Sequence, residues 1–353
     1  MSTRAPHRQT NSPIRNQDHC NIDRTQWERP TAAPVLNQTQ IEACLKQYAP
    51  HGELRTHSAL PDGLANGSWA LRWRQKGQQE DQRTEPQKGQ RQTTPEKGVL
   101  RVSARDHDAF RREAKLLAWL PQEALAPALL HYEPDSVLGY PWELLEWCEG
   151  VSLSQAVQSP FDSHSLAKSI AENCITRIQL KESCPIQLPY LPIIQLPEAM
   201  DALLSNTFVN HRLDKNLRHT LDKAMKHYDS CLEDYAHLDG IAHGDFGGSN
   251  ILVSQENTHT HLTALVDWEF ASFSSLLTDL GNLLRIQALN RDAFINPLQE
   301  AFTQAGYPLP EKWMSLALLA DSLGWLYFLS RPLDRPYLFA DCYRRIHYIT
   351  QRV

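Results

Sequence analysis

The chain has 353 residues, 41% of them hydrophobic, and a formal net charge of −6 at pH 7. This length suits one large domain or two of ordinary size, and the composition is typical of a soluble protein with a substantial core. The acidic excess lies in residues 149–353, which disfavours a nucleic-acid partner. No run of about eighteen apolar residues is free of charged side chains, so we expect no membrane span.

Residues 1–35 lack the apolar segment of a secretory signal and are rich in polar and charged side chains. We therefore expect them to form a disordered tail. The seven cysteines are scattered without paired spacing, which indicates reduced thiols and a cytoplasmic protein.

Residues 36–148 begin with a short predicted helix over 41–48. A turn rich in Gly and Asn then leads into a strand within 60–75. Residues 76–97 contain no apolar side chain, and we expect a mobile loop there. The apolar spacing of GVLRVS predicts a further strand over 98–103.

Helical spacing of apolar residues predicts a helix over 106–120, and two short strands are expected within 129–147. From residue 149 to 353 the pattern becomes mainly helical. It is interrupted by a predicted hairpin whose strands cover 251–254 and 262–268.

This order predicts an α+β fold with two lobes: a small antiparallel sheet lobe over 36–148 and a larger helical lobe over 149–353. The most apolar segment, 314–330, carries Asp321 near its middle and is interpreted as a core helix.

The motif IAHGDFGGSNIL places His243, Asp245 and Asn250 in one short loop, and Asp267 follows the next apolar strand pair. Transfer of a phosphoryl group to an alcohol needs a carboxylate to orient the hydroxyl and oxygen ligands for Mg²⁺. These side chains meet that need if they face one cavity. The alternative for each residue alone is a structural role as a turn or strand cap.

HGDFGGSN resembles the catalytic loop HxDxxxxN of the aminoglycoside phosphotransferase and choline kinase superfamily, which shares the protein-kinase fold, and DWEF resembles its metal-binding element. The resemblance implies that Asp245 is the catalytic base and that Asn250 and Asp267 bind Mg²⁺. It further implies that His243 braces the loop, and that Asp279 ties the following helix to it.

A kinase-like sheet lobe also needs a turn over the phosphates. GLANGS (63–68) fits that turn, and the nucleotide-contacting residues would be Gly63, Asn66, Gly67 and Ser68. Arg101 stands on the third strand where protein kinases use Lys, and Glu113 follows on the next helix as its partner. The alternative for Arg101 is an exposed strand cation.

ELLEWCEGVSL (143–153) resembles the hinge segment of the same superfamily. The resemblance implies that backbone groups near Glu146, Trp147 and Cys148 hold the adenine edge of ATP.

The acceptor is predicted to be a small-molecule alcohol, with a cation as one option. DWEF is similar to choline and thiamine kinases in having a glutamate, Glu269, at its third position. Three roles are open for Glu269: it would approach a second metal, approach a cationic substrate, or make a structural hydrogen bond. Trp313 and Trp325 are candidates for enclosing a cation by cation–π contact. An amino alcohol, thiamine or an aminoglycoside would each fit, and the sequence indicates no oligomeric state.

Two other functions remain open at this point. One is a non-catalytic ATP-binding pseudokinase or scaffold protein, because Arg101 and the glycine turn are atypical. The other is a protein kinase, which the lack of an Ala-Pro-Glu segment after DWEF disfavours.

Overall fold

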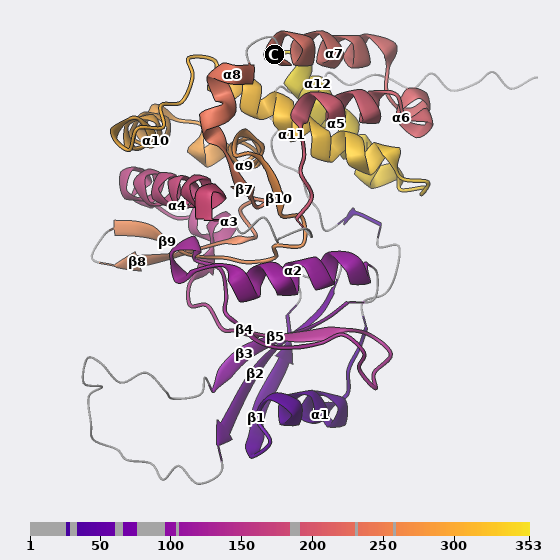
Figure 1. Ribbon diagram of the computed structural model, residues 1–353, viewed down its shortest axis with the longest axis vertical. Helices are drawn as coiled ribbons and strands as arrows, with labels where there is room; N and C mark the ends of the chain where they lie inside the picture. The colour runs from indigo at the N-terminus through magenta and orange to yellow at the C-terminus, as the bar shows by residue number, and fades with distance from the viewer. Residues whose placement is uncertain are drawn as a thin grey trace, which may run out of the picture.

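The computed structural model describes residues 26–28, 34–60, 66–75, 96–103, 106–183, 191–229, 232–256 and 259–353. Over these residues the chain forms a sheet lobe and a larger helical lobe, as predicted (Figure 1). The predicted 76–97 loop lies outside the described residues except for its last two positions, and so does most of the predicted 1–35 tail.

The sheet lobe contains one antiparallel sheet in the order β1-β2-β3-β5-β4. Its strands are β1 (Gly52–Ala59), β2 (Asn66–Gln75), β3 (Lys97–Ser103), β4 (Leu129–Glu133) and β5 (Trp142–Glu146). The prediction missed β1. This strand lies at the sheet edge and most of its side chains are exposed, so it lacks the apolar alternation that marks a half-buried strand.

Helix α1 (Gln38–Tyr48) covers one face of this sheet (Figure 1). It begins with a capping box, in which Asn37 and Gln40 exchange side-chain-to-backbone hydrogen bonds. The helix buries Ile41 and Leu45 in a small core that includes Trp73 of β2.

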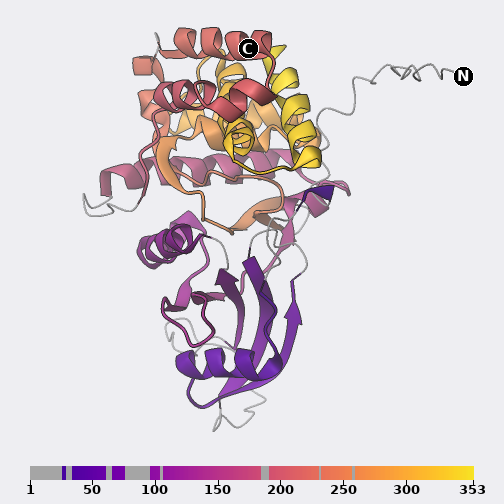
Figure 2. The same ribbon diagram turned by 90° about the vertical axis from the view of Figure 1, so that its right-hand side faces the viewer.

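Helix α2 (His107–Trp119) packs on the other side of the sheet (Figure 1) and borders the helical lobe (Figure 2). Asp106 caps its first turn by accepting the Ala109 N–H at 2.8 Å. Leu116 and Leu117 belong to the main core cluster of the helical lobe. The helix is therefore packed into both lobes.

The helical lobe carries two small sheets, with strand orders β6-β8-β9 and β10-β7. Their strands are β6 (Val151–Ser152), β7 (Asp239–Ala242), β8 (Ile251–Glu256), β9 (His259–Leu265) and β10 (Ser272–Ser275). The predicted hairpin is the pair β8 and β9. The helices are α3 (Leu153–Ala156), α4 (Ser163–Ser183), α5 (Leu196–Leu204), α6 (Thr207–Arg212), α7 (Lys215–Asp229), α8 (Leu232–Tyr235), α9 (Leu277–Leu283), α10 (Asp292–Gln304), α11 (Trp313–Ser330) and α12 (Pro336–Thr350).

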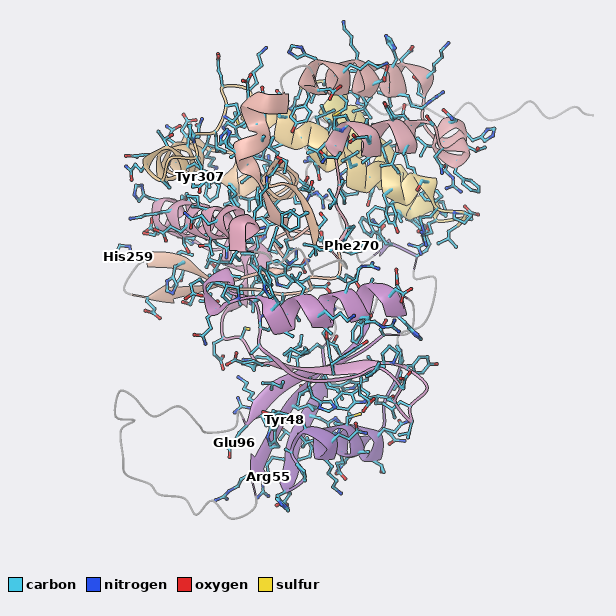
Figure 3. The ribbon with its side chains drawn as sticks, viewed as in Figure 1. Tyr48, Arg55, Glu96, His259, Phe270 and Tyr307 are labelled. Atoms are coloured by element: carbon cyan, nitrogen blue, oxygen red, sulfur yellow. The ribbon has the colours of Figure 1, made fainter. Side chains whose placement is uncertain are left out.

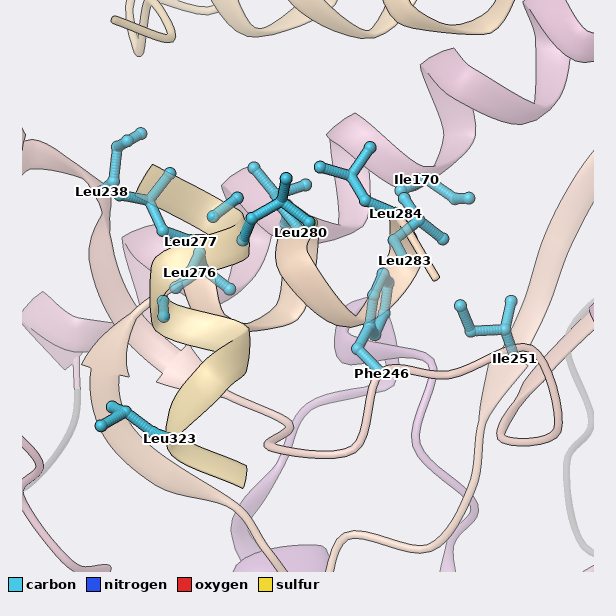
Figure 4. Close-up of a cluster of buried hydrophobic side chains, with 14 of the residues drawn as sticks. Ile170, Leu238, Phe246, Ile251, Leu276, Leu277, Leu280, Leu283, Leu284 and Leu323 are labelled. Atoms are coloured by element: carbon cyan, nitrogen blue, oxygen red, sulfur yellow. The ribbon is translucent and has the colours of Figure 1, made fainter. Parts of the chain in front are cut away.

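The core of this lobe forms where α9 meets α4 and α11. Leu283 and Leu284 lie beside Ile170 of α4 and Phe246 of the loop after β7, and Leu276 and Leu277 lie beside Leu238 (Figure 4). Burial of these apolar side chains fixes the floor on which that loop rests.

By length and composition α11 is apolar enough to cross a membrane, but 61% of it is buried inside the protein. Its central residue, Asp321, is buried and accepts hydrogen bonds from Arg285, Arg345 and the Trp325 indole. This burial is that of a core helix, as predicted.

Residues 26–28, here called the N-terminal anchor, pack on the helical lobe. The Trp27 indole donates to Asp341 Oδ2 of α12 at 2.7 Å. The Trp27 ring meets Trp325 and Phe328 of α11 edge-on, with centroid distances of 6.3 and 5.7 Å. The prediction of a disordered tail is therefore wrong for residues 26–28, because aromatic contacts and a hydrogen bond hold the Trp27 indole on the helical lobe.

Glu28 completes the anchor at the start of α12. Its carboxylate accepts the N–H groups of Tyr337 and Leu338 at 2.8 and 3.3 Å, where a helix leaves donors unpaired. Eight positions later, Leu36 is buried in the small core of the sheet lobe. The chain thus contacts the helical lobe before it enters the sheet lobe.

Candidate active site

We call residues 243–250 the catalytic loop after the family motif that they resemble; they connect β7 to β8. The Asn250 side-chain amide donates to the Asp245 backbone carbonyl at 2.9 Å and to Asp245 Oδ2 at 3.0 Å. The turn at Gly244 has φ of +80°, and a Cβ there would overlap the Phe270 carbonyl, so the position requires glycine. The Asp245 side chain stays 21% exposed and so remains accessible.

Asp279, near the start of α9, holds the beginning of this loop. Its two carboxylate oxygens accept the N–H groups of His243 and Gly244 at 2.8 and 2.9 Å. Arg177 of α4 forms a fully buried ion pair with Asp279 and donates to the Ile241 carbonyl at 3.0 Å. Arg177 is not among the residues predicted from the sequence, although a charged residue on the apolar face of a helix was a usable signal.

His243 joins the catalytic loop to the segment after β9. It is fully buried, and burial lowers its pKa, so the ring is neutral at neutral pH. The hydrogen-bond pattern assigns the proton to Nε2, which donates to the Val266 carbonyl at 3.1 Å, while Nδ1 accepts the Asp245 N–H at 3.4 Å. The ring thus braces the loop, the role that the family resemblance implies.

Asp267 lies directly beside this loop, because the Val266 N–H donates to the Asn250 carbonyl at 2.9 Å. Its backbone has φ of +69°, a strained left-handed conformation for a residue with a side chain. The Asp267 side chain is 38% exposed, and its Oδ1 accepts from Arg101 Nη2 at 2.6 Å. Phe270, three positions further, lies at the boundary between the lobes (Figure 3).

Arg101 of β3 is the centre of a buried ionic cluster that we call the Arg101 cluster: Arg101, Glu113, Glu143 and Asp267. Arg101 Nη1 donates to Glu113 Oε1 at 2.6 Å and to Glu143 Oε1 at 2.9 Å. Glu113 also accepts the Trp268 N–H at 2.8 Å, so α2 is bonded to the segment that carries Asp267. The alternative of an exposed strand cation at Arg101 is wrong, since its side chain is only 8% exposed.

The sequence analysis also missed Glu143. It lies on β5 directly opposite Arg101 of β3 and is fully buried. A glutamate inside the apolar strand WELLE was the available signal, because a buried carboxylate needs a partner.

The two buried glutamates outnumber the one buried guanidinium. Burial raises the pKa of Glu143 well above its usual value, and the nearby Glu113 raises it further, against the opposing effect of Arg101. Burial likewise raises the pKa of Glu113. Within the described residues, Oε2 of each has no hydrogen-bond partner. The cluster therefore favours a proton on one of the two glutamates.

The predicted phosphate-covering turn is only partly described, since Gly63 lies outside the described residues. Asn66, Gly67 and Ser68 lie in strand β2, not in a turn, and Ser68 pairs with Arg101. A Cβ on Gly67 would approach the Pro34 carbonyl to 2.6 Å, so the absence of a side chain at this position lets the backbone at Pro34 pass close to β2.

The predicted hinge begins where β5 ends at Glu146, whose N–H donates to the Ala128 carbonyl at 2.9 Å. Trp147 and Cys148 are half-buried, and Lys97 lies over the Trp147 ring at 4.1 Å. These residues connect the sheet lobe to β6 of the helical lobe.

The predicted role of Trp313 and Trp325 in enclosing a cationic substrate is wrong. Both are 1% exposed and belong to the core. The cation over the Trp325 ring is the protein's own Arg285, at 4.7 Å. Glu269 is half-buried in the turn after Asp267.

Arg285, just after α9, is a further residue that the sequence analysis missed. Its Nη1 lies 3.8 Å from Asp245 Oδ1. Its Nε and Nη2 donate to Asp321 Oδ1 at 2.8 and 2.5 Å. The sequence offered no signal for it, since Asp245 and Asp321 approach it only in the fold.

The sheet lobe, the helical lobe and the loop that brings Asn250 to Asp245 form the two-lobed arrangement that the sequence predicts. The chain belongs to the phosphotransferase enzyme family, whose profile matches residues 81–314, well over half of its length. A search of curated proteins found no match.

Solved structures share the fold at low sequence identity. The GDP complex of wild-type aminoglycoside 2'-phosphotransferase-IIIa is 16% identical, with a TM-score of 0.65 over 90% of this chain and 99% of that one. A putative aminoglycoside phosphotransferase from Ralstonia eutropha JMP134 is 13% identical, with a TM-score of 0.61 over 90% and 99%. A thermostable mutant of aminoglycoside phosphotransferase APH(4)-Ia is 16% identical, with a TM-score of 0.57 over 88% and 98%.

Proposed function

We propose that this protein transfers the γ-phosphoryl group of ATP to a hydroxyl group of a small molecule. The observation that carries the proposal is the position of Asn250. Its side-chain amide donates to Asp245, and its backbone carbonyl accepts the N–H of Val266, the residue before Asp267; this adjacency supports one shared site for the proposed base and the proposed metal ligands. Structural relatives in complex with GDP and with AMP-PNP support a nucleotide at this site.

In this proposal Asp245 orients the acceptor hydroxyl and accepts its proton at a carboxylate oxygen. The loop is held for that task by Asn250 at one end and by Asp279 at the other. Preset geometry of this kind lowers the cost of bringing the hydroxyl into line with the phosphoryl group.

The donor set of Asn250 and Asp267 fits Mg²⁺, a hard cation that binds oxygen ligands and keeps several sites for water and phosphate. The partly exposed carboxylate of Asp267 would hold the ion together with Asn250. When bound, Mg²⁺ neutralises charge on the triphosphate. Arg101, held by Glu113 and Glu143, is placed beside the same carboxylate and would contact the phosphates.

The contact between Arg101 and Asp267 favours a second candidate, a non-catalytic nucleotide-binding protein, because Arg101 competes with a metal for that carboxylate. Substitution Asp245→Ala separates the two. We expect kcat for ADP release to fall by a factor of at least about 100, while binding of ATP–Mg²⁺ in a thermal-shift assay persists. Equal turnover in Asp245→Ala and the wild type would overturn the proposed base. Binding of ATP–Mg²⁺ by the wild type without ADP release above an enzyme-free control would leave only the binding function.

A further inference from the structure

Arg285 places a fixed positive charge next to the proposed catalytic base. Its guanidinium lies 3.8 Å from the Asp245 carboxylate and stacks over Trp325. The Nε and Nη2 atoms are both bonded to Asp321 Oδ1, so the Nη1 end faces Asp245. The side chain is 17% exposed and can still be reached by a ligand.

This guanidinium is positioned before any ligand binds. Asp321, which holds it, is itself held from two sides, by Arg345 of α12 at 3.1 Å and by the Trp325 indole at 3.1 Å. Asp321, Arg345 and Trp325 are all buried. An arginine fixed in this way loses little side-chain entropy when it binds a ligand.

The surface of α11 beside Arg285 is open. Gly324 is exposed, and a Cβ built on it would find only Arg285 Nη2 within 4 Å, at 3.8 Å, among the described atoms. One turn further along the same face, Tyr327 is 44% exposed, and Arg331 lies over its ring at 5.4 Å. The described side chains named here therefore give this face two arginines and a tyrosine.

The formal charges of the group formed by Asp245, Arg285, Asp321 and Arg345 cancel, whereas the neighbouring Arg101 cluster has more carboxylates than guanidinium groups. Asp245 and Asp321 carry two negative charges, and Arg285 and Arg345 carry two positive ones. A polycationic acceptor would need uncompensated carboxylates at this point, whereas an oxyanion is the natural partner of a preset guanidinium.

We propose that the acceptor alcohol carries an oxyanion, a carboxylate or a phosphate, close to the hydroxyl that is phosphorylated, and that Arg285 binds it. This inference rests on the proposed function. With the hydroxyl bonded to Asp245 and the oxyanion to Arg285 Nη1, hydrogen-bond lengths of about 2.8 Å place the two groups roughly 4–6 Å apart. Two or three carbons between hydroxyl and carboxylate satisfy this separation.

The test uses pairs of alcohols matched in size that differ in charge, with the full chain and ATP–Mg²⁺. Each pair contains a hydroxy acid and the corresponding amino alcohol, and an added hydroxyalkyl phosphate distinguishes phosphate from carboxylate. Phosphorylated product and ADP release are both measured. We expect kcat/KM to favour the anionic member by about tenfold or more, as one charge-assisted contact provides.

Two variants assign the preference to Arg285. Arg285→Gln should bring the ratio within a pair close to one, mainly through KM of the anionic member, whereas Arg285→Lys should retain part of it. Arg352→Gln, which removes an exposed arginine near the C-terminus, serves as the matched control and should leave the ratio unchanged. Thermal unfolding of each variant verifies that it is folded.

The outcomes separate the two proposals. Preferred phosphorylation of the amino alcohols, or an unchanged ratio in a folded Arg285→Gln variant, overturns the anionic acceptor and leaves the phosphotransferase function standing. Absence of phosphoryl transfer to any alcohol, with no ADP release, overturns the proposed function and this inference together.

Discussion

The Arg101 cluster leads to a prediction in which two substitutions at one ion pair differ strongly in their cost to stability. Arg101→Met leaves the buried carboxylates of Glu113 and Glu143 without a counter-charge. Removal of one partner from a buried pair costs about 3–5 kcal/mol of unfolding free energy. Glu143→Gln instead removes the surplus negative charge and keeps an Oε1 atom that can accept from Arg101. We expect it to stay within about 1 kcal/mol of the wild type at neutral pH.

The pH dependence of stability provides a second measurement. Burial raises the pKa of Glu143 above 4.5, its ordinary value, so the folded protein binds this proton more tightly than the unfolded chain does. The resulting stabilisation is complete below about pH 4.5 and is lost as pH rises through the folded-state pKa. The stability of Glu143→Gln relative to the wild type should therefore increase as the pH rises from about 4.5 through the folded-state pKa of Glu143.

Urea unfolding of the wild type and both variants across this pH range measures these quantities directly. A loss in Glu143→Gln as large as that in Arg101→Met would refute the reasoning, because it would mean that Glu143 is a required charge partner. A relative stability of Glu143→Gln that falls with rising pH would refute it as well.

Three further predictions concern the catalytic loop and the anchor. Asp279→Asn leaves the buried Arg177 without its counter-charge and should lower the unfolding free energy in urea by about 3 kcal/mol. It should also lower kcat without changing nucleotide affinity, and an unchanged kcat would contradict the role of Asp279 in holding the catalytic loop. Gly244→Ala should lower the thermal midpoint by several degrees because of its positive φ and crowded Cβ, and an unaltered midpoint would be inconsistent with this geometry. Trp27→Phe, which loses the bond to Asp341 but keeps a ring, should cost about 1 kcal/mol, and Trp27→Ala clearly more; equal losses would show that the ring contacts contribute nothing.

Local patterns in the sequence were sufficient to predict much of the fold. The apolar alternation of β3 and the helical spacing of α2 identify both elements, because their buried faces are determined within a few residues. Edge strand β1 was missed because its exposed, polar residues carry no such pattern.

The site was predictable where its members are close in sequence. The spacing of Asp245 and Asn250 in one loop predicts that the two side chains lie close together. In the structure Asn250 Nδ2 lies 3.0 Å from Asp245 Oδ2. Arg177, Glu143 and Arg285 were missed because each acquires its role from partners that are distant along the chain. Burial and charge pairing of that kind exist only after the lobes have folded.

The N-terminal anchor has a consequence for motion between the lobes. Trp27 is fixed to α11 and α12, and Leu36 is buried in the sheet lobe, nine positions later. A fully extended chain covers at most about 3.6 Å per residue, so these two points can never be more than roughly 32 Å apart while the anchor stays bound. The two lobes are thus connected twice, by residues 146–150 and by the N-terminal segment. Any motion that would separate Trp27 and Leu36 by more than about 32 Å requires Trp27 to leave its site on α11 and α12.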